Sequence, residues 1–395
     1  MKQRILFMHQ ASSIGGGSYC LLNVVKAVDK TLWEPVVALK GDGLLADELR
    51  KLGVEVVIFR QMAAIPYNRG LLQRGSLKAY MDVKKSIPAL KELLKSKHVD
   101  VLYLNNMMLC RYLQPAKECG CKTVVHVREH WPLNEHKRQL ERARKCVYQY
   151  ADKMVAINHY SASMFPGKEA TIVYDWIDME GRYKPMPMSD IFGEDMTGKK
   201  VLLYMGGMQR IKGAFEVVKA FSDTVKDTNY RLLVMGFTKE LSGKGMVGKI
   251  KMLMYRLGIP TYEYKVKMLI RKDSRIACMN GVYEIKDIVE QVHGMLSYFT
   301  IPHANLAMAE SIILGTPVIA ARTEESDEYT KNGKLASLFK MNDMKDFERA
   351  ICDFMADDIH LRCALTIEER EKVADMFSKE RNIAVLNKTL SELNA

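Results

Sequence analysis

Short apolar segments alternate with amphipathic ones along nearly the whole chain, and this alternation limits the folds open to it. Residues 4–9 have the length and composition of a buried strand, and residues 19–28 carry apolar side chains at helical spacing. Further strands are predicted at residues 34–39, 54–59, 99–104, 122–127, 153–157, 201–205, 231–235, 275–279, 294–298 and 317–320. Further helices are predicted at residues 45–52, at 76–95 with an interruption near Pro88, and from 346 onward. Because strands that alternate with helices form parallel sheets, the sequence predicts an α/β, doubly wound fold.

The alternation stops once, which predicts a boundary between two domains. The segment between residues 178 and 198 contains Pro185 and Pro187 and has little periodicity. A chain of 395 residues has room for two domains of about 100–200 residues each. We predict an N-terminal domain at 1–180, a linker at 181–198 and a second domain at 199–375.

Composition excludes several classes of protein. No apolar run approaches the roughly 20 residues that cross a bilayer, and residues 1–8 have a basic start followed by a short strand, unlike a signal peptide. The 8 cysteines form no Cys-x-x-Cys pair, which is typical of reduced cytosolic thiols. A net charge of +12 favours anionic partners: nucleotide phosphates, acidic lipids or nucleic acid. Nucleic acid is disfavoured because no aromatic-rich basic stripe or reading motif is present.

Residues 249–272 interrupt the second series of strands and helices, and they are basic and apolar together. One hypothesis is a surface helix that rests on anionic lipid headgroups, which would make the protein peripheral at the inner face of the membrane. The alternative is an ordinary core-facing helix with solvated lysines.

Three loops at predicted strand ends could bind an anion, since ligands of open α/β sheets bind at the carboxyl ends of strands. The first contains Gly15, Gly16 and Gly17, which let the backbone approach a ligand closely ahead of a helix N-terminus. A plain tight turn is the alternative. The loop lacks the Gly-x-Gly-x-x-Gly spacing, which disfavours a nicotinamide cofactor.

The second loop spans residues 206–213 and joins a strand to an amphipathic helix. Arg210 and Lys212 place two cations at the strand end, where they could stabilise a diphosphate and the charge that develops as a sugar departs. The alternative is a solvated basic turn.

The third loop leads into a short predicted helix. Asn305 is a natural N-cap of this helix and Gly315 a natural C-cap. The free backbone N–H groups at the start of this helix favour an anion. Glu310 could accept hydrogen bonds from a ribose diol. The alternative is a surface glutamate on an ordinary helix.

Residues 15–17, 45–54, 201–213 and 309–320 together resemble the retaining GT-B glycosyltransferases of family four, over nearly the whole chain. The resemblance implies two Rossmann-like domains that face each other across a cleft. It also implies that the terminal helix, at 376–395, crosses back to the N-terminal domain. The residues that would bind the nucleotide-sugar donor are Gly16, Gly17, Gly207, Arg210, Lys212, Gly281, Val282, His303, Ala304, Asn305, Leu306 and Glu310.

The chain departs from the family pattern at three places. Pro302 stands where the first glutamate of the Glu-x7-Glu motif is expected, so no carboxylate is available there for the transferred sugar. Gly207 stands where the family has an arginine five residues before Lys212, and Arg210 must substitute. A histidine near the reacting sugar could be His126 or His130.

These two histidines, with Arg210 and Lys212, are the predicted catalytic residues. The alternative for either histidine, and the more frequent case in proteins, is a hydrogen-bonded structural residue. Gly15, Arg128 and Glu129 are predicted to bind the acceptor. A structural ion pair between Arg128 and Glu129 is the alternative.

The predicted function is hexosyl transfer, with retention, from a nucleoside diphosphate sugar to a glycan or lipid-linked acceptor in the assembly of a surface polysaccharide. The predicted location is cytoplasmic. We expect no metal or other cofactor, because cationic side chains and helix N-termini can supply the positive charge. The alternatives are a nucleotide-sugar epimerase of the same architecture and a non-catalytic GT-B subunit that binds a glycan or a partner protein.

Overall fold

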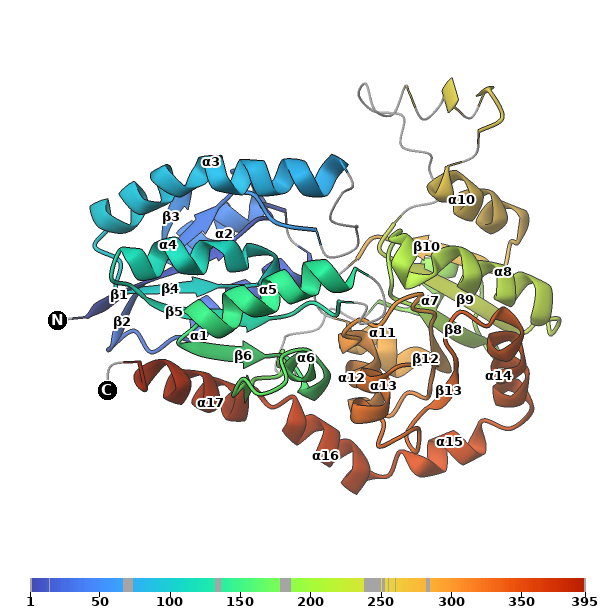
Figure 1. Cartoon of the computed structure of the whole chain (residues 1–395). Helices are drawn as coiled ribbons and strands as arrows, with labels where there is room; N and C mark the ends of the chain where they lie inside the picture. Colours follow the sequence, from blue (N-terminus) through green and yellow to red (C-terminus); the bar gives the residue numbers. More distant parts are fainter. Residues whose placement is uncertain are drawn as a thin grey trace. The chain divides into compact units, whose positions relative to one another are not determined.

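The computed structural model describes residues 2–13, 15–66, 74–131, 136–177, 186–237, 250, 253–254, 256–259, 261–281 and 285–393. The chain forms two compact units (Figure 1). Unit 1 consists of residues 1–176 and 377–395, and unit 2 of residues 177–376. Within the predicted linker, the short helix α7 (Met188–Phe192) already belongs to unit 2, because Met188 is buried in the core of that unit.

Unit 1 is built on a parallel sheet of seven strands in the order β3-β2-β1-β4-β5-β6-β7. The strands are β1 (Gln3–His9), β2 (Trp33–Leu39), β3 (Glu55–Ile58), β4 (Val101–Leu104), β5 (Lys122–Val127), β6 (Lys153–Ala156) and β7 (Thr171–Ile172). The helices are α1 (Gly16–Ala27), α2 (Leu44–Lys51), α3 (Arg74–Ser96), the 3-10 helix η1 (Met107–Tyr112), α4 (Leu113–Glu118), α5 (Lys137–Tyr150), α6 (His159–Ser163) and α17 (Lys379–Ser391).

Both faces of this sheet are covered by helices (Figure 1). Successive side chains of a strand point to opposite faces. Leu6 and Met8 of β1 therefore pack with α3, α4 and α5, while Ile5 and Phe7 pack with α1, α2 and α17. Burial on both faces explains why the strands are almost continuously apolar.

Unit 2 contains a second parallel sheet, of six strands in the order β10-β9-β8-β11-β12-β13. The strands are β8 (Lys200–Tyr204), β9 (Tyr230–Met235), β10 (Ile276–Met279), β11 (Gly294–Ser297), β12 (Val318–Arg322) and β13 (Ser337–Lys340). The helices, besides α7, are η2 (Arg210–Lys212), α8 (Ala214–Thr224), α10 (Tyr262–Lys272), α11 (Lys286–Gln291), α12 (Leu306–Ile313), α13 (Glu324–Tyr329), α14 (Met344–Ala356), α15 (Ile359–Ala364) and α16 (Ile367–Met376).

The sheet of unit 2 is also covered on both faces. Leu202 and Tyr204 of β8 pack with α8, α10 and α14, whereas Val201 and Leu203 pack with α7 and α11. The α/β, doubly wound prediction is thereby confirmed for both halves of the chain.

The prediction of an interruption at Pro88 is wrong, because α3 continues through this residue from Arg74 to Ser96. Proline removes one helical hydrogen bond, which leaves the carbonyl of Lys84 without its intrahelical donor. Both Lys84 and Pro88 are exposed, so water can hydrate that carbonyl. The helix is also held by the apolar face that it packs against the sheet, where Leu90 and Leu94 are buried.

Part of the basic and apolar segment 249–272 is a core-facing helix. Val266 and Ile270 of α10 are buried in the core of unit 2, and the Thr261 side chain caps the helix by accepting from the Tyr264 amide. Of residues 249–260, the structure describes 250, 253–254 and 256–259. Among all described helices, none combines the length and the hydropathy that a bilayer-spanning helix requires.

Candidate functional site

Each sheet has one point at which the strand order reverses, and ligands of open α/β sheets bind there, beyond the carboxyl ends of the strands. In unit 1 this point lies between β1 and β4, and in unit 2 it lies between β8 and β11. The loops that follow β1, β8 and β11 are the three that the sequence analysis selected. Each unit therefore has a candidate site at the position where its topology favours one.

In unit 2, the loop after β8 is fixed against the loop after β11. The Thr300 amide donates a 2.9 Å hydrogen bond to the carbonyl of Ile211, next to Lys212. Gly213 has a φ of +73°, and a Cβ at this position would lie 2.1 Å from the carbonyl oxygen of Tyr298. A glycine is needed for this close approach. The two loops predicted to bind the donor are therefore adjacent, on one edge of one sheet.

Three glycines line the neighbouring part of this edge, one after each of β8, β9 and β10. The Gly207 amide donates to the carbonyl of Met235, at 3.2 Å. A Cβ on Gly236, whose φ is +102°, would lie 2.7 Å from the Cα of Gly207, and one on Gly281 would lie 3.9 Å from the Cα of Gly236. The three backbones form a surface without side chains, which a ligand could approach closely. Val282, the neighbouring predicted donor residue, lies outside the described residues.

Lys212 lies at the end of η2 and is half-buried. Burial lowers the pKa of its ammonium group, and no carboxylate offsets this effect within the part of the chain that the structure describes. Arg210, on the same turn, is exposed and forms no ion pair with any residue that the structure describes. An unpaired cation that is partly withdrawn from water interacts more strongly with an anionic ligand than a solvated one does.

The N-terminus of α12 lies at the end of the third loop, which follows β11. The Asn305 side chain accepts a hydrogen bond from the Met308 amide at 3.2 Å and donates one to Ser297 at 2.8 Å, so the predicted N-cap is confirmed. Leu306 and Ala307 are the first two residues of the helix, and their N–H groups have no acceptor within it. These amides and the helix dipole favour a negative charge beyond the helix end.

Glu310 is half-buried one turn into α12. Burial raises the pKa of its carboxyl group to about 8, and no described cation or donor counteracts this shift. The carboxyl group is therefore largely protonated at neutral pH when no ligand is bound to it. A ligand with hydroxyl donors would satisfy this group.

The remaining predicted residues of this loop lie between β11 and Asn305. The imidazole of His303 stacks on Phe299, with ring centroids 5.3 Å apart, and its Nδ1 donates to the carbonyl of Ala304 at 3.0 Å. Pro302 is half-buried and brings no side-chain polar atom to the loop.

In unit 1, the glycine loop after β1 is open. A Cβ on Gly15 or Gly16 would meet no described atom within 4 Å. Gly15 is the N-cap of α1 and has no side chain to cap it, and its carbonyl accepts from the Ser18 amide at 3.0 Å. The carbonyl of Gly17 accepts from Asn105, which follows β4, at 3.2 Å. The loop is thus joined to the neighbouring strand end while its outer face stays free of side chains.

A directed chain of hydrogen bonds connects this loop to Arg128, which follows β5. The Arg128 Nε donates to Asn105 Oδ1 at 3.1 Å, so the Asn105 Nδ2 is the donor toward His9 Nδ1 at 3.2 Å. His9 Nε2 must then carry the proton and donate to Ser18 Oγ at 3.1 Å. The Ser18 hydroxyl retains its own proton for a further acceptor.

The charges of this cluster are paired or suppressed. Arg128 forms a buried ion pair with Asp175, its side chain being 7% exposed, rather than with Glu129. Burial and, to a smaller extent, the charge of Arg128 lower the pKa of His9 to about 4, so His9 is neutral at pH 7. Burial raises the pKa of Glu129 to about 7, against the opposing hydrogen bond from the Met107 amide at 2.8 Å.

Both predicted catalytic histidines are buried. His126 is fully buried, its Nδ1 lies 2.7 Å from the Tyr103 hydroxyl, and burial lowers its pKa. His130 is 3% exposed, and its Nε2 lies 2.8 Å from the Ser161 hydroxyl. These contacts favour the structural alternative for both residues, and a catalytic role stays a prediction.

Four residues of these sites were not predicted from the sequence: His9, Asn105, Asp175 and Gly236. His9 ends β1 and Asn105 directly follows β4. His9 and Asn105 could have been predicted as site residues, because each is a polar side chain at the end of a buried parallel strand and such ends meet at the ligand-binding edge of the sheet.

Two parallel-sheet, Rossmann-like units of this kind, with the solved structures that they resemble, define the GT-B fold. Residues 191–373 match the family model described as glycosyl transferases group 1. This match covers most of unit 2, including η2, the three glycines and α12. The search of curated proteins found no match.

Several solved structures resemble the whole chain at low sequence identity. HepE (Alr3699) from Anabaena, solved with UDP and glucose, is 16% identical over 99% of this chain and 98% of its own, with a TM-score of 0.71. Sucrose-phosphate synthase (tll1590) from Thermosynechococcus elongatus is 13% identical over 100% and 99%, with a TM-score of 0.73. The E. coli trehalose-6-phosphate structure bound with UDP-2-fluoro glucose is 12% identical over 99% of both chains, with a TM-score of 0.68.

Proposed function

We propose that the chain is a glycosyltransferase that binds a nucleoside diphosphate sugar at the carboxyl edge of unit 2. The observation that carries this proposal is a pair of partly buried ionisable groups at the switch point of the sheet, Lys212 of η2 and Glu310 of α12, neither of which has a charged partner among the described residues. Groups of this kind cost stability when a site is empty and gain partners when a ligand is bound. The match of residues 191–373 to the group 1 model supports the same function.

In the proposed complex, the pyrophosphate lies between Lys212 and the first amides of α12. The ammonium group and the N–H groups of Leu306 and Ala307 would neutralise its charge and stabilise the additional charge on the departing nucleotide. Arg210 is close enough in sequence to contribute a second cation. Glu310 would accept hydrogen bonds from the two ribose hydroxyls, which favour its ionised form. The glycines at 207, 236 and 281 would leave room for the nucleotide.

We infer that the donor is UDP-glucose or a related UDP-hexose, because HepE was solved with UDP and glucose and the E. coli structure with UDP-2-fluoro glucose. Retention at the anomeric carbon and transfer to a glycan or lipid-linked acceptor of a surface polysaccharide are proposed from the resemblance to family four. The sequence itself supports a nucleotide phosphate as the partner through its net charge of +12.

We propose unit 1 as the acceptor-binding half, through the open glycine loop and the cluster around Arg128. The exposed backbone of Gly15 and Gly16 is available to a sugar there, whereas the Ser18 hydroxyl lies buried behind the loop. Glu129, with a pKa raised to about 7, could exchange a proton near neutral pH.

A cytoplasmic location and a peripheral contact of residues 249–272 with the membrane also stay proposals. Leu253 and Leu257 support the contact, since they lie one helical turn apart and are 56% and 66% exposed. Large exposed apolar side chains within a basic segment are typical of helices that rest on a lipid surface.

The donor site is tested by titrating UDP into the protein and two variants in a calorimeter. Lys212→Met should weaken UDP binding about tenfold to a hundredfold, because the pyrophosphate loses a charged hydrogen-bond donor. Lys226→Met is the matched control, since Lys226 lies beyond the far end of α8 and is exposed. Equal UDP affinity in all three proteins would remove Lys212 from the donor site.

A second candidate function, a non-catalytic subunit, is favoured by one observation: Pro302 brings no carboxylate to the loop where the family has one. UDP-glucose turnover separates the candidates. A transferase releases UDP faster when an acceptor glycan is added, an epimerase isomerises the sugar without an acceptor, and a binding subunit does neither. A protein that binds UDP but releases none from UDP-glucose, even with a panel of glycan acceptors, would favour the binding subunit.

A further inference from the structure

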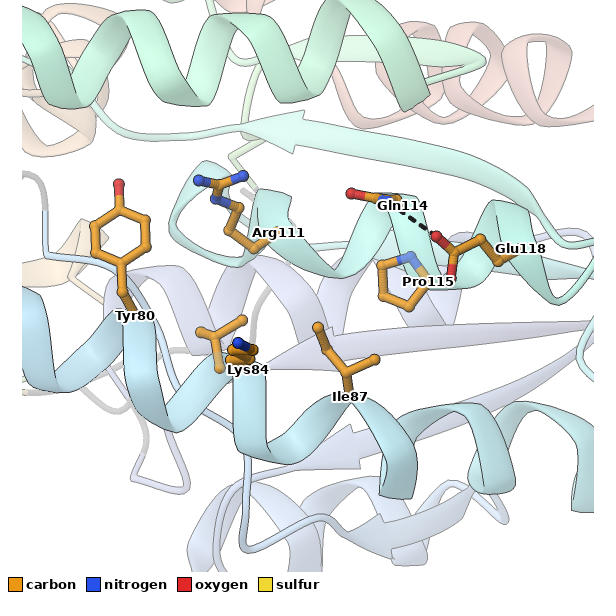
Figure 2. A pocket seen from close by; sticks show the side chains of 8 residues that line it. Tyr80, Lys84, Ile87, Arg111, Gln114, Pro115 and Glu118 are labelled. Atoms are coloured by element: carbon orange, nitrogen blue, oxygen red, sulfur yellow. Dashed lines mark hydrogen bonds between the residues drawn. The ribbon is translucent and has the colours of Figure 1, made fainter.

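Unit 1 contains a cavity of about 350 Å³ in the layer of helices on one face of its sheet (Figure 2). It lies between α3 and the segment formed by η1 and α4. Tyr80, Lys84 and Ile87 rise from α3, whereas Arg111, Gln114, Pro115 and Glu118 project from the facing segment. The volume is at the small end of the range for ligand pockets, about 300–1,000 Å³.

One part of the lining is apolar. Val83 and Pro115 are buried, Ile87 is half-buried, and the ring of Tyr80 adds an aromatic wall. Aliphatic and aromatic surface of this kind gains free energy when an apolar group displaces water from it.

The charged part of the lining has an excess of positive charge. Glu118 is neutralised by an ion pair with Lys91 at 2.6 Å and accepts from Gln114 at 2.9 Å. Lys84 and Arg111 have no carboxylate partner among the residues that the structure describes. The cavity therefore offers two unpaired cations and a carboxylate that is already paired.

The Tyr80 ring holds the arginine in place. The guanidinium carbon of Arg111 lies 5.4 Å from the ring centroid, and that of Arg142, on α5, lies 5.7 Å from it. Cation–π contacts orient a guanidinium group and leave its in-plane N–H donors free for an oxyanion. Arg142 also has no carboxylate partner in the described part of the chain, and it adds to the positive potential beside the cavity.

We propose that this cavity binds a small amphiphilic anion, a phosphate or carboxylate group joined to an apolar body of up to about the size of one aromatic ring. The oxyanion would contact Arg111 and Lys84, and the apolar body would lie against Val83, Ile87 and Pro115. The site is separate from the proposed donor site, which lies in unit 2, and it does not depend on the proposed function.

The cavity shares an element with the cluster at the end of β5. Arg111 belongs to η1, and the amide of Met107, the first residue of η1, donates to Glu129. A ligand in the cavity would therefore contact Arg111 near the end of η1, while Glu129 accepts a hydrogen bond from the first residue of the same helix.

The test uses the full chain, with phenyl phosphate as the probe in calorimetric titrations and inorganic phosphate and benzyl alcohol as comparisons. We expect phenyl phosphate to bind at least about tenfold more tightly than either comparison, because each of them lacks one half of the proposed contact. Inorganic phosphate that binds as tightly as phenyl phosphate would overturn the proposal, since the apolar wall would then contribute nothing.

Four variants locate the probe. Arg111→Gln should weaken binding about tenfold and Lys84→Gln about threefold to tenfold, whereas Lys85→Gln, at an exposed neighbouring lysine that does not line the cavity, should leave it unchanged. Lys212→Met should also leave binding of the probe unchanged. The proposal fails if Arg111→Gln binds like the natural protein, or if Lys212→Met abolishes binding, because the probe would then occupy the site in unit 2.

Discussion

At the scale of single residues, Lys212 and Glu310 are affected by burial in opposite senses. Burial lowers the pKa of the lysine and raises that of the glutamate to about 8, because in each case it disfavours the charged form. Neither shift is offset by a described partner. The two groups are therefore a source of instability in the empty protein, and a ligand that carries both a pyrophosphate and hydroxyl donors would relieve both.

Glu310 makes the stability of unit 2 depend on pH. Its folded-state pKa, about 8, lies above the ordinary value of 4.5, so its contribution to stability is present below pH 4.5 and is lost as the pH rises toward 8. Glu310→Gln should remove this loss and stabilise the protein at pH 8 by on the order of 4 kcal/mol, with little difference at pH 4.5. Urea unfolding at both pH values measures the effect.

Glu290→Gln is the control for that experiment, because Glu290 is exposed on α11 of the same unit. Its unfolding free energy should follow that of the natural protein at both pH values. If Glu310→Gln also shows no difference at pH 8, the carboxyl group is not held in the protonated state and the account of this residue is wrong.

Residue-level prediction from the sequence was limited by contacts between distant segments. Lys212 and Asn305 could be selected because each follows a strongly apolar strand, and Glu310 because it lies in the predicted helix that Asn305 begins. His9 and Asn105 are 96 positions apart, and their hydrogen bond depends on β1 and β4 being neighbours in the sheet. The sequence shows that both strands exist, but their order in the sheet follows from the packing of the whole unit.

At the scale of secondary-structure elements, the carboxyl ends of β8, β9 and β10 are held together through glycine backbones. The Gly236 amide donates to the carbonyl of Met279 at 2.9 Å, and Gly236 itself lies against Gly207. This contact leaves no space for a side chain, and it sets the spacing of the loops on which the donor site depends.

Gly236→Ala should destabilise unit 2 by about 2–4 kcal/mol and weaken UDP binding. Its positive φ disfavours any side chain, at about 1–2 kcal/mol, and the added Cβ would lie 2.7 Å from the Cα of Gly207. Gly198→Ala is the control, since Gly198 has a φ of +71° but no atom within 4 Å of the added Cβ. Equal losses of unfolding free energy in the two variants would show that the close approach is unimportant.

The central strands were predicted from the sequence more accurately than the edge strands and the long helix α3. The long apolar strands stand out because both of their faces are buried, and their positions were predicted to within a few residues. The strands β7 and β13 were not predicted, because two and four residues at the sheet edges carry little periodic signal. The helix α3 was predicted with a break at Pro88 because local propensity favours one, whereas packing along its buried face keeps it continuous.

At the scale of the whole molecule, the chain leaves unit 1 and returns to it. After unit 2 ends at residue 376, α17 packs on the sheet face of unit 1 that also carries α1 and α2. Leu386 and Leu390 are fully buried there, and Asn387 donates to the carbonyl of Ala27 at 3.0 Å. The core of unit 1 therefore includes the last helix of the chain.

Leu386→Ala should lower the free energy of unfolding of unit 1 by about 2–5 kcal/mol, because it leaves a cavity in a fully buried position. Lys388→Ala, two residues away and exposed, should have little effect. Scanning calorimetry of the full chain, with and without UDP, measures the unfolding temperature of each unit. Leu386→Ala should lower the unfolding temperature of unit 1, whereas UDP should raise that of unit 2. A shift of the UDP-stabilised transition alone would contradict the assignment of α17 to unit 1.

A crystal structure of the protein with UDP-glucose tests the central claim most directly. We expect the pyrophosphate at the carboxyl edge of unit 2, with phosphate oxygens roughly 2.7–3.2 Å from Lys212 Nζ and from the amide nitrogen of Leu306 or Ala307. We also expect the ribose hydroxyls beside Glu310. A nucleotide bound elsewhere, with Lys212 and the start of α12 free of contacts to it, would contradict the account.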